Sequence, residues 1–218
     1  MAVIEGLTGL TGLTGLSGLT EDLPIRIVMT DDPMRTKMMA AHWLNNAKTL
    51  YESRGMIGYI GAYNSVDIAL LSVGYGESPT MLYLHDAALL GAQRAIYIGE
   101  CVARRAEDRL RDVIIAKGGD AAMTQNALTT AKQFAISVKV RNVITNDRAL
   151  LDGSSTSEDI ADFASGAVSR LAANHGLAAL SILTVSRNTA TKERMEEHER
   201  QSRFNEATQL VFETLSNS

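Results

Sequence analysis

The chain has 218 residues, 45% of them hydrophobic and 21% charged, so it is long enough to bury one large core. Its net charge is −4 and its basic residues are scattered, which argues against nucleic-acid binding as its main role, because a phosphate backbone requires a basic face. The single cysteine, Cys101, cannot form an intrachain disulfide, and no apolar run approaches the roughly 18 residues of a membrane span. We therefore expect a cytoplasmic protein with no membrane partner.

The N-terminal segment is a tandem repeat. Residues 6–20 read GLTGLTGLTGLSGLT, in which Gly, Leu and Thr or Ser recur in every third place. The segment lacks the basic start and the cleavage site of a signal peptide, and its regular glycines disfavour a helix, because ordering glycine costs more entropy. We predict that residues 1–22 form an arm, flexible or docked on another subunit, before a single domain at residues 23–218. A lid over a neighbouring subunit's site is the alternative.

From residue 25 onward, strand and helix patterns alternate. Short apolar, β-branched runs indicate strands, and apolar residues at helical spacing indicate helices. In chain order, the predicted elements are a strand at 25–29, a helix at 34–46, strands at 56–63 and 67–73 joined by a turn at 64–65, a helix at 79–91, strands at 94–98 and 113–116, a helix at 124–135, a strand at 137–143, a helix at 158–175 ending at Gly176, a strand at 178–185 and a helix at 192–215.

This alternation predicts an α/β fold. We expect one domain, with a largely parallel sheet covered by helices on both faces. In such sheets, ligands bind beyond the carboxyl ends of the strands. The loops that follow the strands therefore hold the candidate site residues, and they lie at residues 30–35, 74–78, 99–103, 145–147 and 186–189.

Short motifs in and near these loops occur in a recognisable order. They are DPMR at 32–35, RGMIGYIG at 54–61, GYG at 74–76, Gly99, LRDVII at 110–115, LTVS at 183–186 and ERQSRFNE at 199–206. Together they resemble the purine nucleoside and uridine phosphorylase family, most closely its bacterial hexameric branch. The resemblance implies a three-layer α/β/α fold with a mixed, largely parallel sheet. It also implies cleavage of the N-glycosidic bond of nucleosides by inorganic phosphate, in homo-oligomers (dimers or hexamers) with shared sites.

By this resemblance, Arg35 would bind phosphate and Arg54 would be lent to the site of a neighbouring subunit. An arginine fork suits either a phosphate or a carboxylate. Purely structural roles stay open as alternatives. The two arginines could form interface salt bridges. Asp162 could be a charge at a helix N-terminus, and Phe163 could be a core residue. The substrate-binding candidates besides the two arginines are Asp32, Tyr75, Gly99, Asp162 and Phe163.

Several positions depart from the family pattern. Asp31 stands where the resemblance implies a glycine, Tyr97 where it implies an arginine, and Glu100 where it implies a serine. Where it implies a ribose-binding glutamate and a base-protonating aspartate, the chain has Ala164 and Arg187. The added carboxylates repel phosphate, alanine accepts no side-chain hydrogen bond, and arginine is no general acid at neutral pH. Ordinary phosphorolysis is therefore not expected.

Glu100 and Arg187 are the catalytic candidates. They end strands that we expect to be neighbours, so we predict a compensating ion pair between them. Glu100 would act as a general base or acid if burial raised its pKa. Two functions stay open: an altered reaction on an anionic or zwitterionic small molecule, or a non-catalytic binding or structural module. We expect no cofactor and no metal, because the four histidines lack metal-ligand spacing.

Overall fold

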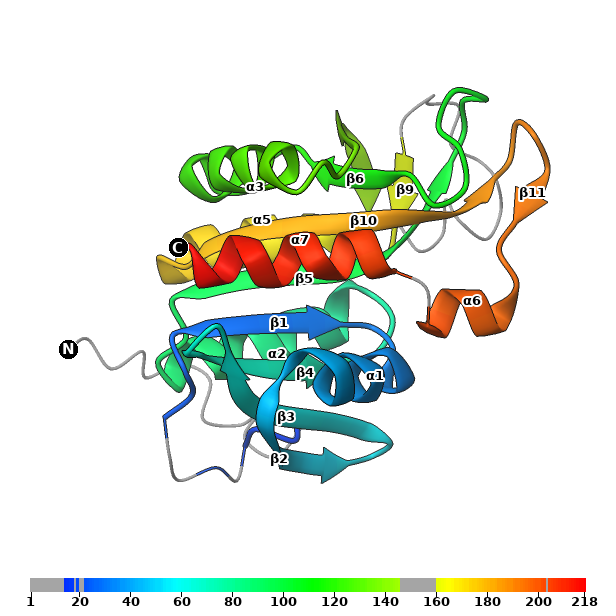
Figure 1. The fold of residues 1–218 in the computed structure, drawn as a ribbon. Coiled ribbons are helices and arrows are strands. Elements are labelled where there is room, and N and C mark those ends of the chain that lie inside the picture. Colours follow the sequence, from blue (N-terminus) through cyan, green and yellow to red (C-terminus); the bar gives the residue numbers. More distant parts are fainter. Residues whose placement is uncertain (1–13, 18, 20–21, 146–159, 203) are drawn as a thin grey trace.

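The computed structural model of the chain describes residues 14–17, 19, 22–145, 160–202 and 204–218. The strands are β1 Arg26–Thr30, β2 Asn45–Ser53, β3 Met56–Tyr63, β4 Val66–Ser72, β5 Arg94–Ala103, β6 Val113–Ala116, β7 Val138–Arg141, β8 Val143–Thr145, β9 Ile160–Asp162, β10 Ala178–Asn188 and β11 Glu193–Arg194. The helices are α1 Pro33–Trp43, α2 Glu77–Leu89, α3 Ala121–Gln133, α5 Ser165–His175, α6 Glu197–Ser202 and α7 Asn205–Ser216 (Figure 1).

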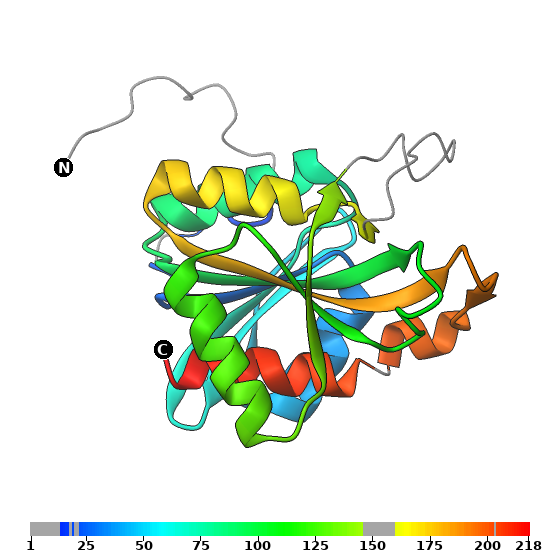
Figure 2. The ribbon, with the colours of Figure 1, turned by 90° about the horizontal axis from the view of Figure 1, so that it is seen from above.

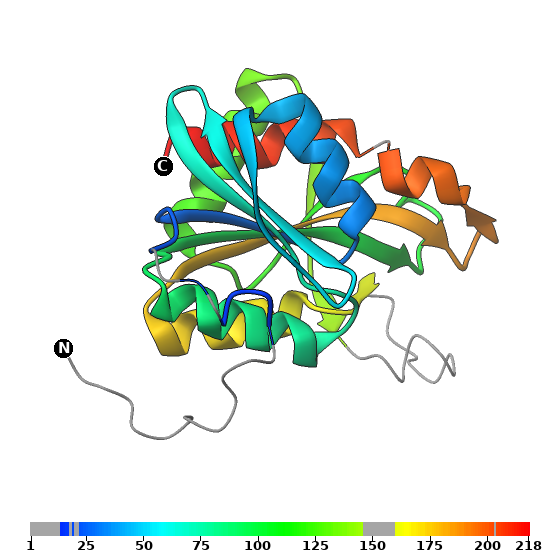
Figure 3. The same cartoon turned by 90° about the horizontal axis from the view of Figure 1, so that it is seen from below.

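The described strands form one mixed sheet in the order β2-β3-β4-β1-β5-β10-β6-β7, with β9 and β11 attached to β5 and β10. At its centre β4, β1, β5 and β10 run parallel, whereas β2, β3 and β6 make antiparallel pairs. Helices α2 and α5 cover one face, and α1, α3 and α7 cover the other (Figures 2 and 3). Buried apolar side chains fill both layers between sheet and helices. The predicted three-layer α/β/α fold with a mixed, largely parallel sheet is confirmed.

The strongest local signals match the structure. The turn between β3 and β4 lies at Asn64 and Ser65, whose φ angles are 48° and 63°. Two consecutive left-handed residues form the kind of tight turn that suits the twist of an antiparallel hairpin. Gly176 follows α5 with φ 67°, in the left-handed conformation that glycine adopts without steric cost.

The predicted helix at 34–46 is too long, and the strand that follows it was not predicted. Helix α1 ends at Trp43, and β2 begins at Asn45. Strand β2 lies at the edge of the sheet, and of its residues only Tyr51 is buried. Because both faces of β2 are largely exposed, its sequence carries no alternation of apolar and polar residues.

Three other predicted elements have different limits. The predicted helix at 158–175 begins only at Ser165, after the short strand β9. The predicted helix at 192–215 is divided into β11, α6 and α7, because Met195 and Phe204 are buried in the core and interrupt it. The predicted strand at 94–98 continues through Gly99 to Ala103, since β5 pairs with β10 along its whole length. The predicted strand at 137–143 is divided into β7 and β8.

The described part of the N-terminal repeat lies on the chain's own domain. The side chain of Leu16 is 1% exposed and belongs to the core cluster under α2 and α5. The N–H of Gly15 donates a hydrogen bond to the Tyr83 hydroxyl, and the Thr14 hydroxyl donates one to Asp86, both on α2. A Cβ atom on Gly15 would lie 2.2 Å from the ring of Tyr51. The division into an arm at 1–22 and a domain at 23–218 stays a prediction, with most of the arm outside the described residues.

No helix in the described part of the chain is long and apolar enough to cross a lipid bilayer.

We expect Gly15→Ala to release residues 14–17 from the domain, because the Tyr51 ring is also hydrogen-bonded to the backbone of β4 through its hydroxyl and has little room to move. Overpacking of this kind costs about 1–3 kcal/mol. Hydrogen exchange at the Leu16 amide and the free energy of unfolding both report the change. Unchanged exchange in the variant would contradict the docking of this segment.

Candidate functional site

A hollow of about 240 Å³ lies where the carboxyl ends of β5 and β10 project beyond the rest of the sheet. Its lining also includes Phe163 between β9 and α5, Arg194 of β11 and Arg200 of α6. Figure 1 shows where these elements lie in the fold. This is the edge at which ligands bind in parallel sheets. The lining residues are Glu100, Cys101, Val102, Phe163, Ser186, Arg187, Arg194, Met195 and Arg200.

Glu100 forms a bidentate ion pair with Arg200 of α6. The Nε of Arg200 donates to Oε2 of Glu100 at 2.7 Å, and its Nη2 donates to Oε1. The Tyr75 hydroxyl donates to the same Oε1 at 3.2 Å. Burial by itself raises the pKa of Glu100, but the hydrogen bonds and charge of Arg200 outweigh burial and lower that pKa. The raised pKa on which the role of Glu100 as a general base or acid depended is therefore not found.

The predicted ion pair between Glu100 and Arg187 is also wrong. The register of β5 and β10 sets Thr184 opposite Glu100 and, after an irregularity at Ser186, sets Arg187 opposite Val102. The Arg187 side chain is exposed, and it makes no hydrogen bond or ion pair within the described residues. Both residues line the same hollow, but the partner of Glu100 comes from a helix about 100 residues farther along the chain.

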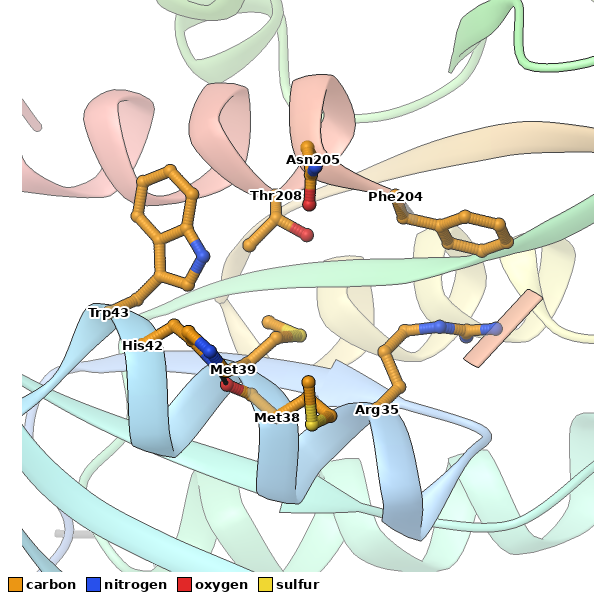
Figure 4. Close-up of a pocket in the computed structure, with 8 residues that line it drawn as sticks. All are labelled: Arg35, Met38, Met39, His42, Trp43, Phe204, Asn205 and Thr208. Atoms are coloured by element: carbon orange, nitrogen blue, oxygen red, sulfur yellow. Dashed lines mark hydrogen bonds between the residues drawn. The ribbon is translucent and has the colours of Figure 1, made fainter. Parts of the chain in front are cut away.

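Arg35, the predicted phosphate ligand, already has partners within the chain. It is 2% exposed, and its Nη1 lies 2.6 Å from Oδ1 of the equally buried Asp31. Its Nη2 donates to the Arg200 carbonyl oxygen at 3.0 Å, and its guanidinium carbon lies 4.2 Å from the centre of the Phe204 ring (Figure 4). Burial raises the pKa of Asp31 to about 6, against the lowering effect of Arg35. A phosphate at Arg35 would have to compete with this carboxylate; the phosphate role stays a prediction.

Asp32 and Asp162 both cap helices. Oδ1 of Asp32 accepts hydrogen bonds from the N–H groups of Met34 and Arg35 at the start of α1. Asp162 is 1% exposed; its Oδ2 accepts from the N–H of Ser165 at 2.8 Å at the start of α5. Its Oδ1 accepts from the hydroxyls of Thr145 and Ser165. These contacts match the structural reading of Asp162 as a charge at a helix N-terminus, and neither carboxylate lines the hollow.

The absence of a side chain at Gly99 leaves space for Tyr97, two residues earlier on β5. A Cβ atom at Gly99 would lie 2.6 Å from the Tyr97 ring, so the tyrosine side chain lies across the glycine. Tyr97 is fully buried, and burial raises its pKa well above the usual range. The glycine is thus needed for packing against Tyr97, and it is not among the residues that line the hollow.

Tyr75 and Phe163 form the aromatic part of the site. Their rings meet edge to face at 5.8 Å, and Phe163 lines the hollow. Burial, together with the charges of Asp31 and Glu100, raises the pKa of Tyr75, so its hydroxyl stays protonated as a donor to Glu100. The core reading of Phe163 is therefore incomplete, because its ring also faces the site.

Arg54 does not reach the hollow of its own subunit. It lies in the turn between β2 and β3, is exposed, and has a φ of 54°. Its role in a neighbouring subunit's site stays a prediction.

Sequence reasoning missed Arg194 and Arg200 as site residues. Arg200 falls in the ERQSRFNE motif, so the motif itself was the available signal. Arg194 reaches the hollow only because β11 folds back on β10, with Arg194 opposite Arg187. No group of three or more potential metal ligands occurs in the described ranges.

A second hollow, of about 350 Å³, lies between α1 and the start of α7 (Figure 4). Methionine and aromatic side chains dominate its walls. Nδ1 of His42 donates a hydrogen bond to the Met38 carbonyl, and Arg35 is paired with Asp31. This hollow thus offers no unpaired charge for chemistry. Its lining residues are Arg35, Met38, Met39, His42, Trp43, Phe204, Asn205 and Thr208.

The chain is similar to curated enzymes over most of its length. It is 29% identical to the DeoD-type purine nucleoside phosphorylase of Bacillus subtilis over 218 residues, covering 87% of this chain and 93% of that one. It is 29% identical to the Haemophilus ducreyi enzyme of the same name, covering 87% and 91%. It is 27% identical to DeoD-type enzyme 2 of Vibrio parahaemolyticus, covering 90% and 95%. No protein-family model matches the chain.

A solved structure has the same fold. The crystal structure of purine nucleoside phosphorylase from Toxoplasma gondii, in complex with immucillin-H, superposes with a TM-score of 0.84 at 19% identity and covers 97% of this chain and 98% of that one. The architecture is thus the three-layer α/β/α fold of nucleoside phosphorylases. In sequence, the chain resembles curated purine nucleoside phosphorylases over most of its length.

We expect Arg200→Gln to lower the free energy of unfolding by about 1.5–3 kcal/mol, because it leaves the buried Glu100 carboxylate without its charged donor. Adding Glu100→Gln should restore part of this loss. In urea denaturation, the double-mutant cycle of the two positions should give a coupling of roughly 0.5–3 kcal/mol.

The matched control replaces Arg187 with glutamine in the same cycle. Glu100→Gln and Arg187→Gln should be additive within about 0.5 kcal/mol, since the two side chains have no direct contact. A larger coupling energy of Glu100 with Arg187 than with Arg200 would contradict the ion pair between Glu100 and Arg200.

Proposed function

We propose that this chain binds an anionic or zwitterionic small molecule in the hollow at the ends of β5 and β10. One observation carries the proposal: Arg187 and Arg194 line this hollow beside Phe163, whereas the carboxylate of Glu100 is already balanced by Arg200. The wall therefore has an excess of positive charge next to an aromatic surface. A neutral nucleoside leaves such charges without partners, and a ligand with a negative group satisfies them.

The same residues argue against ordinary phosphorolysis. Ala164 is fully buried and has no side-chain acceptor for a ribose hydroxyl. Arg187 stands where the resemblance implies a base-protonating aspartate, and an arginine is no general acid at neutral pH. Arg35, the predicted phosphate ligand, is paired with Asp31.

Two versions of the function differ in chemistry. In the first, the chain is an enzyme with an altered reaction, and the ionised Glu100 accepts a proton from the bound molecule as Arg187 stabilises developing negative charge. In the second, it is a non-catalytic binding module. The tight pair of Glu100 with Arg200 and Tyr75 favours the second version, because a carboxylate with three donors and a lowered pKa is a weak base.

A thermal-shift screen tests the binding proposal. Nucleosides, free bases, phosphate and small carboxylates are each added to the purified protein. A ligand at one hundred times its Kd stabilises the folded state by about 2.7 kcal/mol, which is measurable as a rise in Tm. Shifts confined to anionic or zwitterionic compounds are expected; shifts confined to neutral nucleosides would contradict the proposal.

We predict that inosine, adenosine and uridine are not measurably phosphorolysed. The missing proton donor alone lowers the rate by a factor of roughly 100 to 10,000, and the missing ribose contact lowers it further. Release of free base is measured with each nucleoside and inorganic phosphate, with the Bacillus subtilis relative as the positive control. Ordinary turnover of any of the three nucleosides would defeat this prediction.

We also predict a cytoplasmic dimer or hexamer, because the family resemblance implies shared sites and Arg54 matches a residue lent by a neighbour. Sedimentation or light scattering at micromolar concentration measures the assembly. A monomer would remove the site role of Arg54, which lies away from the hollow of its own subunit.

A further inference from the structure

Two arginines stand opposite each other on the β10–β11 ribbon. Arg187 and Arg194 are register partners in its antiparallel pairing. Side chains of directly opposite residues share one face of a ribbon, with their Cβ atoms about 4.5–5.5 Å apart. Two like charges in this arrangement repel each other, so the pair destabilises the unliganded ribbon.

Neither arginine is neutralised by the described part of the chain. Both side chains are exposed, and neither has an ion pair or hydrogen bond to another described residue. The carboxylate on the same wall, Glu100, is held by both ends of the Arg200 guanidinium. Both arginines thus line the hollow without a paired carboxylate among the described residues.

The lining of the same hollow also includes an aromatic ring. Phe163 lines it, and the edge-to-face contact with Tyr75 holds the ring in place. Tyr75 is in turn anchored by its hydrogen bond to Glu100. Flat rings pack favourably against such a surface. The walls of the hollow therefore offer one contact for a ring and one for an anion.

We propose that Arg187 and Arg194 together bind the carboxylate of a small aromatic or heteroaromatic acid, whose ring packs against Phe163. A carboxylate fits better than a phosphate because Glu100 lines the same hollow, and its repulsion is weaker for a singly charged group than for a doubly charged one. This inference rests on the proposed function and names the chemical class of its ligand.

The test compares nicotinate with nicotinamide by isothermal titration calorimetry. The two compounds share a ring, and only nicotinate carries a negative charge. Nicotinate should bind at least about 10-fold more tightly, since a fork of arginines donates charge-assisted hydrogen bonds to it. Arg187→Gln and Arg194→Gln should each weaken nicotinate about 10- to 100-fold and leave nicotinamide nearly unchanged. Inorganic phosphate should bind more weakly than nicotinate.

Lys192→Gln is the matched control. Lys192 is an exposed cation on the turn between β10 and β11, and it does not line the hollow. This variant should keep the full preference for nicotinate. In the absence of any ligand, Arg187→Gln and Arg194→Gln should each raise Tm slightly or leave it unchanged, because each variant removes the repulsion between the two arginines. A fall in Tm in both would contradict the proposed repulsion.

The outcomes separate this inference from the function on which it rests. A preference for nicotinate that persists in both arginine variants overturns the arginine site and leaves an anion-binding pocket intact. Equal binding of nicotinate and nicotinamide, lost in Phe163→Ala, overturns the anionic ligand while retaining a ring-binding hollow. If neither compound binds and the wider screen also finds no ligand, the proposed function and this inference both fail.

Discussion

The ion pair between Glu100 and Arg200 is the interaction on which the site depends. A carboxylate that is 4% exposed requires a charged, hydrogen-bonding partner, because an unpaired buried charge costs several kcal/mol. The partner is provided by α6, so the pair fastens this short helix to the end of β5. The carbonyl oxygen of Arg200 accepts a hydrogen bond from Arg35. This contact links the buried pair of Arg35 and Asp31 to the pair of Glu100 and Arg200. Both pairs are thus parts of one network.

This network decides which charges remain for a ligand. Asp31 balances Arg35, and Glu100 balances Arg200. The cations left at the hollow are Arg187 and Arg194, on the ribbon at its outer wall. The proposed anion site therefore lies in the hollow that Phe163 also lines, and not at Arg35. The proposed ligand carries its charge near its ring, and in this respect the proposed function departs from nucleoside phosphorolysis.

Part of the site was predictable from the sequence. Glu100 and Arg187 were expected at the carboxyl ends of neighbouring strands, and Phe163 was a substrate-binding candidate within a predicted helix; all three line one hollow. The partner of Glu100 was not predictable. Glu100 and Arg187 lie on neighbouring strands, but the register of these strands and the irregularity at Ser186 place Thr184, and not Arg187, opposite Glu100. Asp32 and Asp162 cap helices, a role that short-range contacts to N–H groups determine, and their expected binding of substrate stays a prediction.

By itself, the sequence determined the elements whose signals are local. The β3–β4 hairpin, the end of α5 at Gly176 and the α/β class all follow from turn residues and apolar periodicity that act over a few positions. Only the tertiary structure decided the edge strand β2, the division of residues 192–215 and the meeting of Arg187 with Arg194. These features depend on pairing and burial between segments far apart in the chain, where long-range contacts override local propensity.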